Sequence, residues 1–379
     1  MIGTLNRRQS RGLARRLTPP EAERVAAGAA DAVDAWLLLL ARLAALGPLV
    51  LLGMLVFVLA IAGAARAGDC GGADLMERWQ ATAPDRIAAI KAEAARVPNS
   101  HGTFWKITRD GAAPSYLLGT MHVSDPRVLA MPKGAAEAFQ QAKTVVVESD
   151  EIADDRKAAV ALMARPELTM LDDGKTINDY LMPQDQARLR DGLAARGLSL
   201  DLVSRMRPWM LASFVALPPC ELQRKAAGEA FLDKQLADRA LAEGKALKGL
   251  ETLAEQVEAM NSLPVAFHLK ALLETLAMGD KAQDVLRTTT DLYLSGAIGM
   301  ILPMMEAAGA DAGQADDKGA SADFEKRIIL DRNQVMATRA APMLADGGVF
   351  MAVGALHLPG EGGVIALLRQ KGFEITPVE

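Results

Sequence analysis

Hydrophobic residues recur along this chain with two periods, one typical of short strands and one typical of amphipathic helices. Apolar or β-branched runs at residues 103–108 and 115–120 flank an Arg-Asp-Gly turn signal and predict a β-hairpin. Further strands are predicted at residues 144–148, 246–251, 348–353 and 373–378. The predicted strands therefore lie near both ends of the region 103–379.

Helical spacing accounts for most of the remaining apolar positions. Pro84 opens a leader helix within residues 68–102, and Pro183 opens a helix that closes at Gly197. Other helices are predicted at residues 134–142, 231–243, 254–308, 321–345 and 363–370, and an Ala-, Gly- and Asp-rich stretch at 307–320 is expected to be an exposed linker. This order predicts a single split α/β core, formed by residues 103–150, 245–251 and 347–379, with a mainly helical insertion at about 151–243.

One uncharged apolar stretch precedes this body. The 23 residues from Leu43 to Ala65 carry no charge, and a helix of that length would cross the roughly 30 Å hydrocarbon layer. Five arginines and no acid lie within the first twenty residues of the tail 1–42, which is therefore expected to stay cytoplasmic while the body is exported.

Two fates are open for the segment 43–67. Ala65-Arg66-Ala67 has the small-x-small form of a signal-peptidase site, which would release the body. Without cleavage, residues 43–65 would anchor the body to the membrane. The two cysteines, Cys70 and Cys220, both follow this segment, so export to an oxidising compartment predicts a disulfide between them.

Charge argues against one class of partner. The chain has a formal net charge of −5 and only 4% aromatic residues, and its excess of arginine is confined to the first 67 positions. A nucleic-acid-binding surface needs basic side chains to replace phosphate counterions. The acidic body is therefore not expected to bind nucleic acid.

Two of the four histidines stand in the same Gly-x-x-His context directly after an apolar strand. His122 follows the strand 115–120, and His357 follows the strand 348–353. Glu148 and Glu251 end two further strands, and open α/β sheets bind ligands at the carboxyl ends of their strands. Two imidazoles with one or two carboxylates can form the first shell of a Zn, Mn or Co ion. An alternative interpretation is that the two acids simply mark where solvent begins.

Residues elsewhere carry weaker signals. Arg332 and Asn333 lie on the predicted helix 321–345, where they form a solvated face or else bind a substrate carboxylate, an oxyanion or a reacting group. His268 lies among leucines at helical spacing and His101 lies in a loop, and neither has an acid at ligand spacing. Both are interpreted as structural.

Five sequence blocks resemble the TraB/PrgY/GumN family, which includes the animal TIKI metalloproteases. The blocks are YLLGTMHVSDPR at 116–127, VVVE at 145–148, GLET at 249–252 with EQ at 255–256, RN at 332–333 and VGALHLPGEGG at 353–363. The resemblance spans about residues 103–379 and implies a split α/β domain whose active centre contains His122, Glu148 and His357. It also strengthens Glu251, Arg332 and Asn333 as catalytic candidates.

The resemblance favours an exported, metal-dependent hydrolase of the peptidase type in a bacterial cell envelope, either anchored in the inner membrane or free in the periplasm. His122, Glu148 and His357 would hold a divalent ion (Mn, Co or Zn), and the substrate would be a peptide or another envelope component. Two alternatives stay open. One is a metal-independent esterase-like hydrolase with His122 as the base, oriented by Glu148. The other is a non-catalytic factor that binds a peptide, a glycan or haem.

Overall fold

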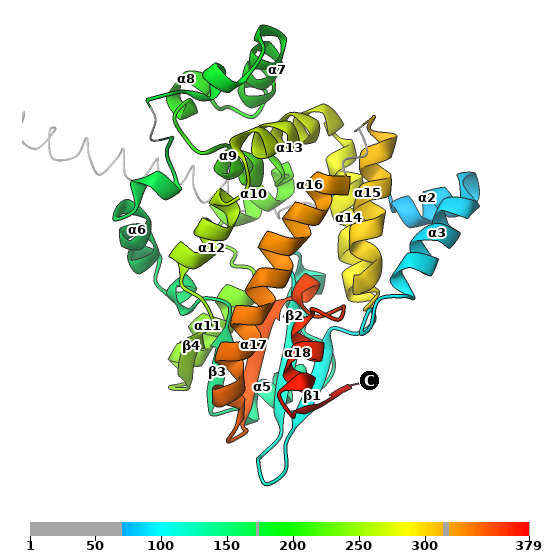
Figure 1. Ribbon diagram of the computed structural model, residues 1–379, viewed down its shortest axis with the longest axis vertical. Coiled ribbons are helices and arrows are strands. Elements are labelled where there is room, and N and C mark those ends of the chain that lie inside the picture. The colour runs from blue at the N-terminus through cyan, green and yellow to red at the C-terminus, as the bar shows by residue number, and fades with distance from the viewer. Residues whose placement is uncertain (1–69, 172–173, 314–317, 379) are drawn as a thin grey trace, which may run out of the picture. The chain divides into compact units, whose positions relative to one another are not determined.

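The computed structural model describes residues 70–171, 174–313 and 318–378, and a six-stranded sheet with helices beside it forms the lower part of the view in Figure 1. Its strands follow the order β4-β3-β5-β2-β1-β6. They are β1 (Phe104–Thr108), β2 (Ser115–Thr120), β3 (Thr144–Val147), β4 (Ala246–Gly249), β5 (Val349–Gly354) and β6 (Glu374–Pro377). The predicted mixed α/β class with a helical insertion is thereby confirmed.

The central strands share one direction. Strand β5 pairs in parallel with both β2 and β3, and β3 pairs in parallel with β4. Strands β1 and β6 complete the sheet through antiparallel pairs. Because β5 lies between two strands from the other end of the domain, the core is split in sequence but continuous in space. The carboxyl ends of β2, β5, β3 and β4 all lie at one edge.

Helices cover both faces of the sheet. Alternate residues point to opposite faces, so Val146 and Met351 pack with α17 (Asp331–Leu344) and α18 (Val364–Gln370). Val145 and Phe350 pack on the other side with α5 (Ala135–Gln141) and α11 (Leu232–Ala242). This double burial is why the strand sequences are continuously apolar rather than alternating.

The chain between β3 and β4 is helical. It contains α6 (Asp155–Met163), α7 (Pro183–Ala194), α8 (Leu200–Val203), α9 (Pro208–Val215), α10 (Pro219–Ala226) and α11. Helices α7 and α9 bury Leu189 and Leu211 against α13 (Val265–Met278), which follows α12 (Leu253–Asn261). This part of the protein therefore has a core of its own beside the sheet.

The leader forms two helices where the sequence predicted one. Helix α2 (Leu75–Thr82) and α3 (Pro84–Ala94) meet at Ala83, whose backbone is non-helical because it precedes a proline. Leu75 and Trp79 are buried in the same core as residues of α14 (Lys281–Leu294) and α15 (Ile301–Asp311). The leader is thus packed against the body.

The predicted linker at 307–320 was largely wrong. Helix α15 continues to Asp311 and α16 spans Lys318–Phe324, since alanine has the highest helix propensity and outweighs the scattered glycines. The predicted helix 321–345 corresponds to α16, a π-helical turn at Glu325–Leu330, and α17. The tail 1–42 and the hydrophobic segment 43–67 lie outside the described residues.

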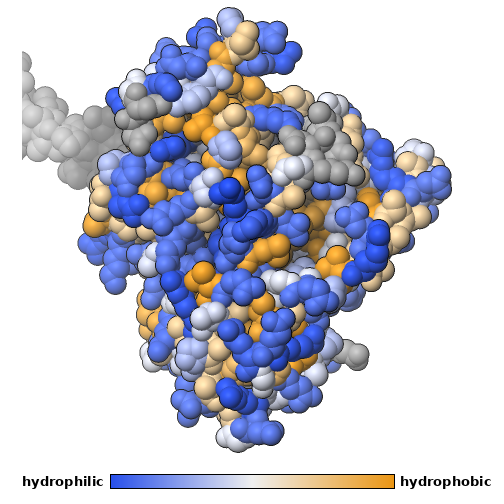
Figure 2. Space-filling model, in the orientation of Figure 1, coloured by the Kyte–Doolittle hydropathy of each residue, from blue (hydrophilic) through white to orange (hydrophobic). Residues whose placement is uncertain are grey.

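The predicted disulfide is confirmed, with Cys70 bonded to Cys220 across 150 positions of sequence. No helix within the described ranges is long and apolar enough to cross a membrane. On the face shown in Figure 2, hydrophilic side chains predominate and hydrophobic ones form separate patches between them.

Substitution of Phe350 tests how much side-chain packing in the sheet contributes to stability. The side chain of Phe350 is fully buried and its ring lies 5.4 Å from that of Phe139. We expect Phe350→Ala to lower the free energy of unfolding by about 3–5 kcal/mol, because it leaves a cavity in the centre of the sheet. Urea denaturation of the full-length chain measures this. The control is Leu202→Ala in α8, a side chain that is 86% exposed and should change stability by less than about 0.5 kcal/mol.

Candidate functional site

Four parallel strands bring four polar side chains to one edge of the sheet. His122 follows β2, His357 follows β5, Glu148 follows β3 and Glu251 follows β4. Glu148, Glu251 and His357 are buried, whereas the His122 side chain is 55% exposed. The arrangement is a buried polar cluster with one imidazole open to solvent.

Gly354 is the point around which three of these side chains meet. A methyl group placed on its Cα would lie 3.1 Å from Glu148 Oε1, 3.4 Å from His357 Cδ2 and 3.8 Å from His122 Nε2. The Gly354 amide also donates to Glu148 Oε1 at 2.7 Å. Since Gly354 has an ordinary negative φ of −52°, glycine is needed here for space rather than for backbone freedom.

Arg332, on α17, contacts both Glu148 and Glu251. Its Nη2 donates to Glu148 Oε2 and Glu251 Oε2, each at 2.8 Å, and its Nε lies 3.2 Å from Glu251 Oε1. The planar guanidinium suits such multiple contacts with carboxylates. Two buried acids can therefore lie close together because one buried cation is shared between them.

The electrostatics follow from this cluster. Burial alone would raise the pKa of the Glu148 carboxyl, but His357, His122, Arg332 and the Gly354 amide together lower it to about 2. Burial raises the pKa of Glu251 despite its contacts with Arg332. Burial, with Arg332 and His122 adding to it, lowers the pKa of His357 to about 4 although Glu148 opposes the shift, so this imidazole is neutral at pH 7.

His357 is oriented by Asn333. Its Nδ1 lies 2.6 Å from Asn333 Oδ1, while Asn333 Nδ2 donates to the Gly362 carbonyl at 2.9 Å. Since the amide oxygen can only accept, Nδ1 of His357 carries the proton and Nε2 keeps a free lone pair. Asn333 is fully buried, so it positions the histidine rather than facing a substrate.

His122 is oriented by a residue that the sequence did not single out. Its Nδ1 lies 3.1 Å from Asp233 Oδ2, and Asp233 Oδ1 accepts from the Thr120 hydroxyl at 2.6 Å. Asp233 lies on α11 at helical spacing with the buried Ala237 and Ala240. An acid on the apolar face of a helix was the signal that could have identified it.

Gln256, which belongs to the residues that carry the family resemblance, contacts Glu148. The side-chain amide of Gln256, on α12, donates to Glu148 Oε2 at 3.1 Å. This carboxylate oxygen therefore accepts from both Gln256 and Arg332. Glu148 Oε1, with one backbone donor, retains an acceptor position toward the histidines; His357 Nε2 is 3.8 Å away. His268 on α13 contacts the Met260 carbonyl of α12 at 2.9 Å and makes no contact with the site residues.

The donors fit a divalent transition-metal ion by their chemistry. His122 Nε2, the His357 ring and Glu148 Oε1 surround Gly354, and each histidine has its Nδ1 fixed by an oxygen, as is usual for metal-binding histidines. Among the described residues, no three His, Cys, Asp or Glu side chains form a closed cluster that could hold a metal ion.

The fold and the site define one class of protein. It is an α/β protein with two oriented histidines and two arginine-bridged acids at the carboxyl ends of its parallel strands. The chain belongs to the TraB/PrgY/gumN family, whose model matches residues 103–377. This confirms the family expected from the sequence blocks.

Curated relatives of the chain are named as metalloproteases. It is 27% identical over 314 residues to metalloprotease TIKI1 of Danio rerio, covering 72% of this chain and 62% of the relative. It is 26% identical to human metalloprotease TIKI1, covering 72% and 61%, and 26% identical to metalloprotease TIKI2 of Xenopus tropicalis, covering 78% and 64%. The chain thus spans less than two thirds of the length of these relatives. No solved structure gives a significant match.

The Asp233 contact predicts how His122 titrates in the metal-free protein. Partial desolvation of His122 lowers its pKa, but the carboxylates of Asp233 and Glu148 outweigh this effect and raise the pKa to about 9. We expect Asp233→Asn to move the His122 pKa well below 9, as measured by NMR of the histidine ring. The control is Asp238→Asn, an exposed acid on the same helix.

The sign of the linked stability follows from this shift. A raised pKa means that the folded state favours the protonated form of His122. The stabilisation of the fold by protonated His122 is therefore complete below pH 6.5 and is lost as the pH rises through about 9. In Asp233→Asn this alkaline loss of stability should be smaller than in the wild type. An unchanged His122 titration in the variant would contradict the assignment of Asp233.

Gly354→Ala tests the space at the centre of the site. The added methyl group would crowd Glu148 Oε1 at 3.1 Å, so we expect divalent-metal binding to weaken by about tenfold or more while the fold is kept. Metal titration by calorimetry gives the affinity, and circular dichroism checks the fold. Unaltered affinity would show that Gly354 does not need to be small.

Proposed function

We propose that the protein is a metal-dependent hydrolase of the peptidase type, with His122, His357 and Glu148 as the metal-binding residues. The observation that carries this proposal is the convergence of two Nδ1-anchored imidazoles and Glu148 Oε1 around Gly354. The names of the TIKI relatives support the same class of activity.

A divalent ion held there would polarise a substrate carbonyl and make a bound water acidic. The surrounding side chains would serve that chemistry. Asp233 and Asn333 keep both histidines in the tautomer that presents Nε2. Arg332 lies 14% exposed beside Glu148, where it can bind a carboxylate or a developing negative charge of the substrate.

Glu251 has two proposed roles. It holds the guanidinium of Arg332, since both of its carboxylate oxygens accept from that group. Burial raises the pKa of Glu251, which makes it a better proton acceptor than an exposed glutamate. We assign it as the general base, with proton transfer at Oε1, whose contact with Arg332 Nε is the longer one at 3.2 Å.

A metal-independent hydrolase is the second candidate, and one observation favours it. His122 and Asp233 form a half-exposed imidazole–carboxylate pair, the arrangement of a general base and its orienting acid. In this reading Asp233, not Glu148, orients the base. With its pKa raised to about 9, however, His122 is protonated at neutral pH and cannot accept a proton, whereas a metal ion would displace that proton.

For the location, we propose that the body faces the periplasm, where its substrate would be a peptide of the cell envelope. The Cys70–Cys220 disulfide supports this, because such bonds persist in oxidising compartments. Whether residues 43–65 act as an anchor or a cleaved signal is decided by N-terminal sequencing of the mature protein.

Metal content tests the main proposal. Full-length protein purified without chelators should carry about one Mn, Co, Zn or Fe ion per chain by elemental analysis. A His122→Ala, His357→Ala double variant should lose it, while His101→Ala, an exposed histidine outside the site, should keep it. Peptidase activity should disappear with EDTA and return with Mn, Co or Zn.

Two outcomes would reject the metal proposal. Wild-type protein that carries no metal and gains no activity with these ions would remove its basis. Hydrolysis that survives EDTA but is lost in His122→Ala would instead favour the metal-independent hydrolase.

A further inference from the structure

The loop that carries His122, residues 121–127, is held from two sides. On one side is α10, where Glu221 Oε2 accepts from the Ser124 amide at 2.9 Å and from its hydroxyl at 2.8 Å. On the other side is α14, where Asp291 accepts from Arg127 at 2.9 Å. We call this segment the His122 loop.

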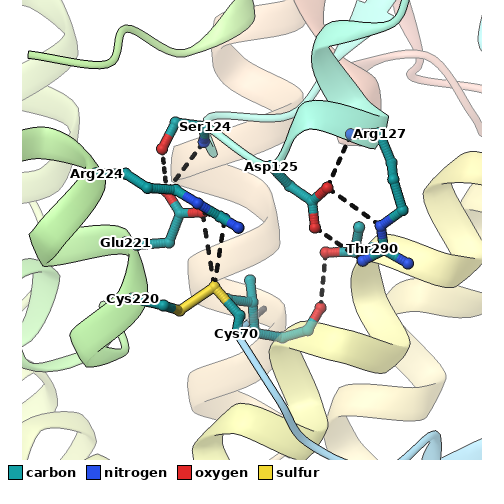
Figure 3. Close-up of a disulfide and its surroundings, with 9 residues drawn as sticks. Cys70, Ser124, Asp125, Arg127, Cys220, Glu221, Arg224 and Thr290 are labelled. Carbon is teal, nitrogen blue, oxygen red and sulfur yellow. Dashed lines mark hydrogen bonds and ion pairs between the residues drawn. A yellow bond between two sulfur atoms is a disulfide. The ribbon is translucent and has the colours of Figure 1, made fainter. Parts of the chain in front are cut away.

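Glu221 is held rigidly where it binds the loop. Its side chain is buried, and its Oε1 accepts from Arg224 Nη1 at 2.7 Å. Arg224 is also buried, and the same Nη1 lies 3.3 Å from Cys70 Sγ (Figure 3). The disulfide, the arginine and the glutamate therefore form one chain of contacts that ends two residues beyond His122.

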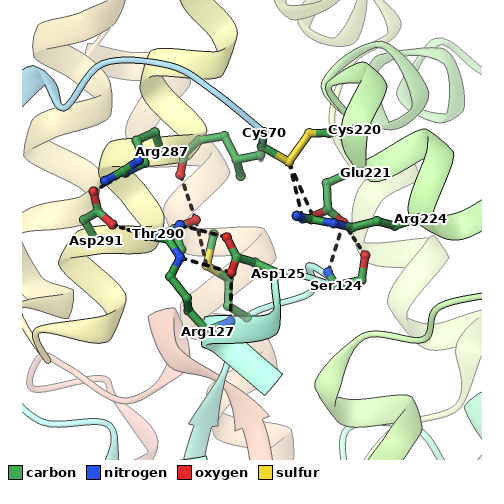
Figure 4. A network of polar contacts seen from close by, with 12 residues as sticks. Cys70, Ser124, Asp125, Arg127, Cys220, Glu221, Arg224, Arg287, Thr290 and Asp291 are labelled. Carbon is green, nitrogen blue, oxygen red and sulfur yellow. Dashed lines mark hydrogen bonds and ion pairs between the residues drawn. A yellow bond between two sulfur atoms is a disulfide. The ribbon is translucent and has the colours of Figure 1, made fainter. Parts of the chain in front are cut away.

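The disulfide also joins the two sides. Cys220 belongs to α10, whereas Cys70 lies in the leader, which hydrogen-bonds to α14 through its backbone and through Arg78. The Ala73 amide donates to Asp284 Oδ1 at 2.7 Å, and the Leu75 amide donates to Thr288 Oγ1 at 2.8 Å. Figure 4 shows the loop residues Ser124, Asp125 and Arg127 between these two helices, with the disulfide crossing above them.

We propose that Glu221, Arg224 and the Cys70–Cys220 disulfide are positioning residues for His122. They fix the separation of α10 and α14 and so fix the loop between them. The consequence for catalysis rests on the proposed function, but the ordering of the loop does not.

We expect reduction of the disulfide to release the His122 loop from its fixed position between α10 and α14. A dithiol supplies two electrons and two protons, which yields two cysteine thiols and the cyclic disulfide of the reagent. Both cysteines are only partly buried, so a small reagent reaches them. The link between α10 and the leader is then lost while the sheet keeps its hydrogen bonds.

Hydrogen exchange measured by mass spectrometry on the metal-free, full-length chain tests the proposal. We expect amide exchange in residues 121–127 to rise about tenfold in Cys70→Ser, Cys220→Ser and in Glu221→Leu, Arg224→Met, and to stay unchanged in β5. The second variant replaces the buried ion pair with apolar groups, so that no unpaired charge remains. Glu221→Gln combined with Arg224→Met keeps an acceptor for Ser124 without an unpaired arginine, so it should retain most of the protection.

The control is Glu243→Gln, which alters an exposed acid paired with Arg239 and should change nothing in the loop. Unchanged exchange in residues 121–127 both in Cys70→Ser, Cys220→Ser and in Glu221→Leu, Arg224→Met would overturn the proposal. So would an equal rise throughout the sheet, because that would indicate general loss of stability.

Binding of Zn²⁺ or Mn²⁺ alone provides the second measurement. We expect about 10- to 100-fold weaker affinity in Cys70→Ser, Cys220→Ser and in Glu221→Leu, Arg224→Met, and near-normal affinity in Glu221→Gln, Arg224→Met. If wild-type protein binds neither ion while loop exchange still rises in the variants, the proposed function fails and the positioning role stands. Normal metal affinity with a loosened loop would overturn the link to His122.

Discussion

Two carboxylates buried side by side need a cation between them, and Arg332 meets that need for Glu148 and Glu251. Removing one partner of a buried ion cluster generally costs about 3–5 kcal/mol, since it leaves an uncompensated charge. The arginine lies on α17, while the acids follow β3 and β4. The cluster therefore fixes the last long helix of the chain over strand ends formed much earlier in the sequence.

The two histidines are oriented from opposite layers of the protein. Asn333, next to Arg332 on α17, holds His357 from one face of the sheet. Asp233 on α11 holds His122 from the other face. Because α17 also places Arg332, one helix sets the positions of His357 and of both acids, while the helical insertion provides the contact for His122. The site therefore requires both halves of the split core and the insertion.

Local patterns in the sequence were enough to predict the strands that build the site. Continuous apolar runs, the two Gly-x-x-His motifs and the strand-end acids identified His122, His357, Glu148 and Glu251. The disulfide was predictable because only two cysteines follow the hydrophobic segment. Each of these features depends on a few neighbouring residues or on a count.

Residues that act through distant contacts were not predictable in the same way. Asp233 lies 111 positions from His122, and Glu221 lies 97 positions from Ser124. Asn333 was identified, but its role behind His357 depends on a contact with the Gly362 backbone that no spacing rule reveals. At 307–320, glycine and aspartate suggested a linker because helix propensity was given too little weight against turn residues.

The π-helical turn at Glu325–Leu330 immediately precedes the helix that carries Arg332 and Asn333. Each π turn contains more residues than an α turn, so it shifts the angular phase of everything that follows around the helix axis. Helix α17 thus meets the sheet with a rotation that differs from the one α16 would have imposed by simple continuation. If the same six residues wound as an α-helix, they would turn α17 further around its axis and direct a different pair of neighbours at the strand ends, without changing any amino acid in the site.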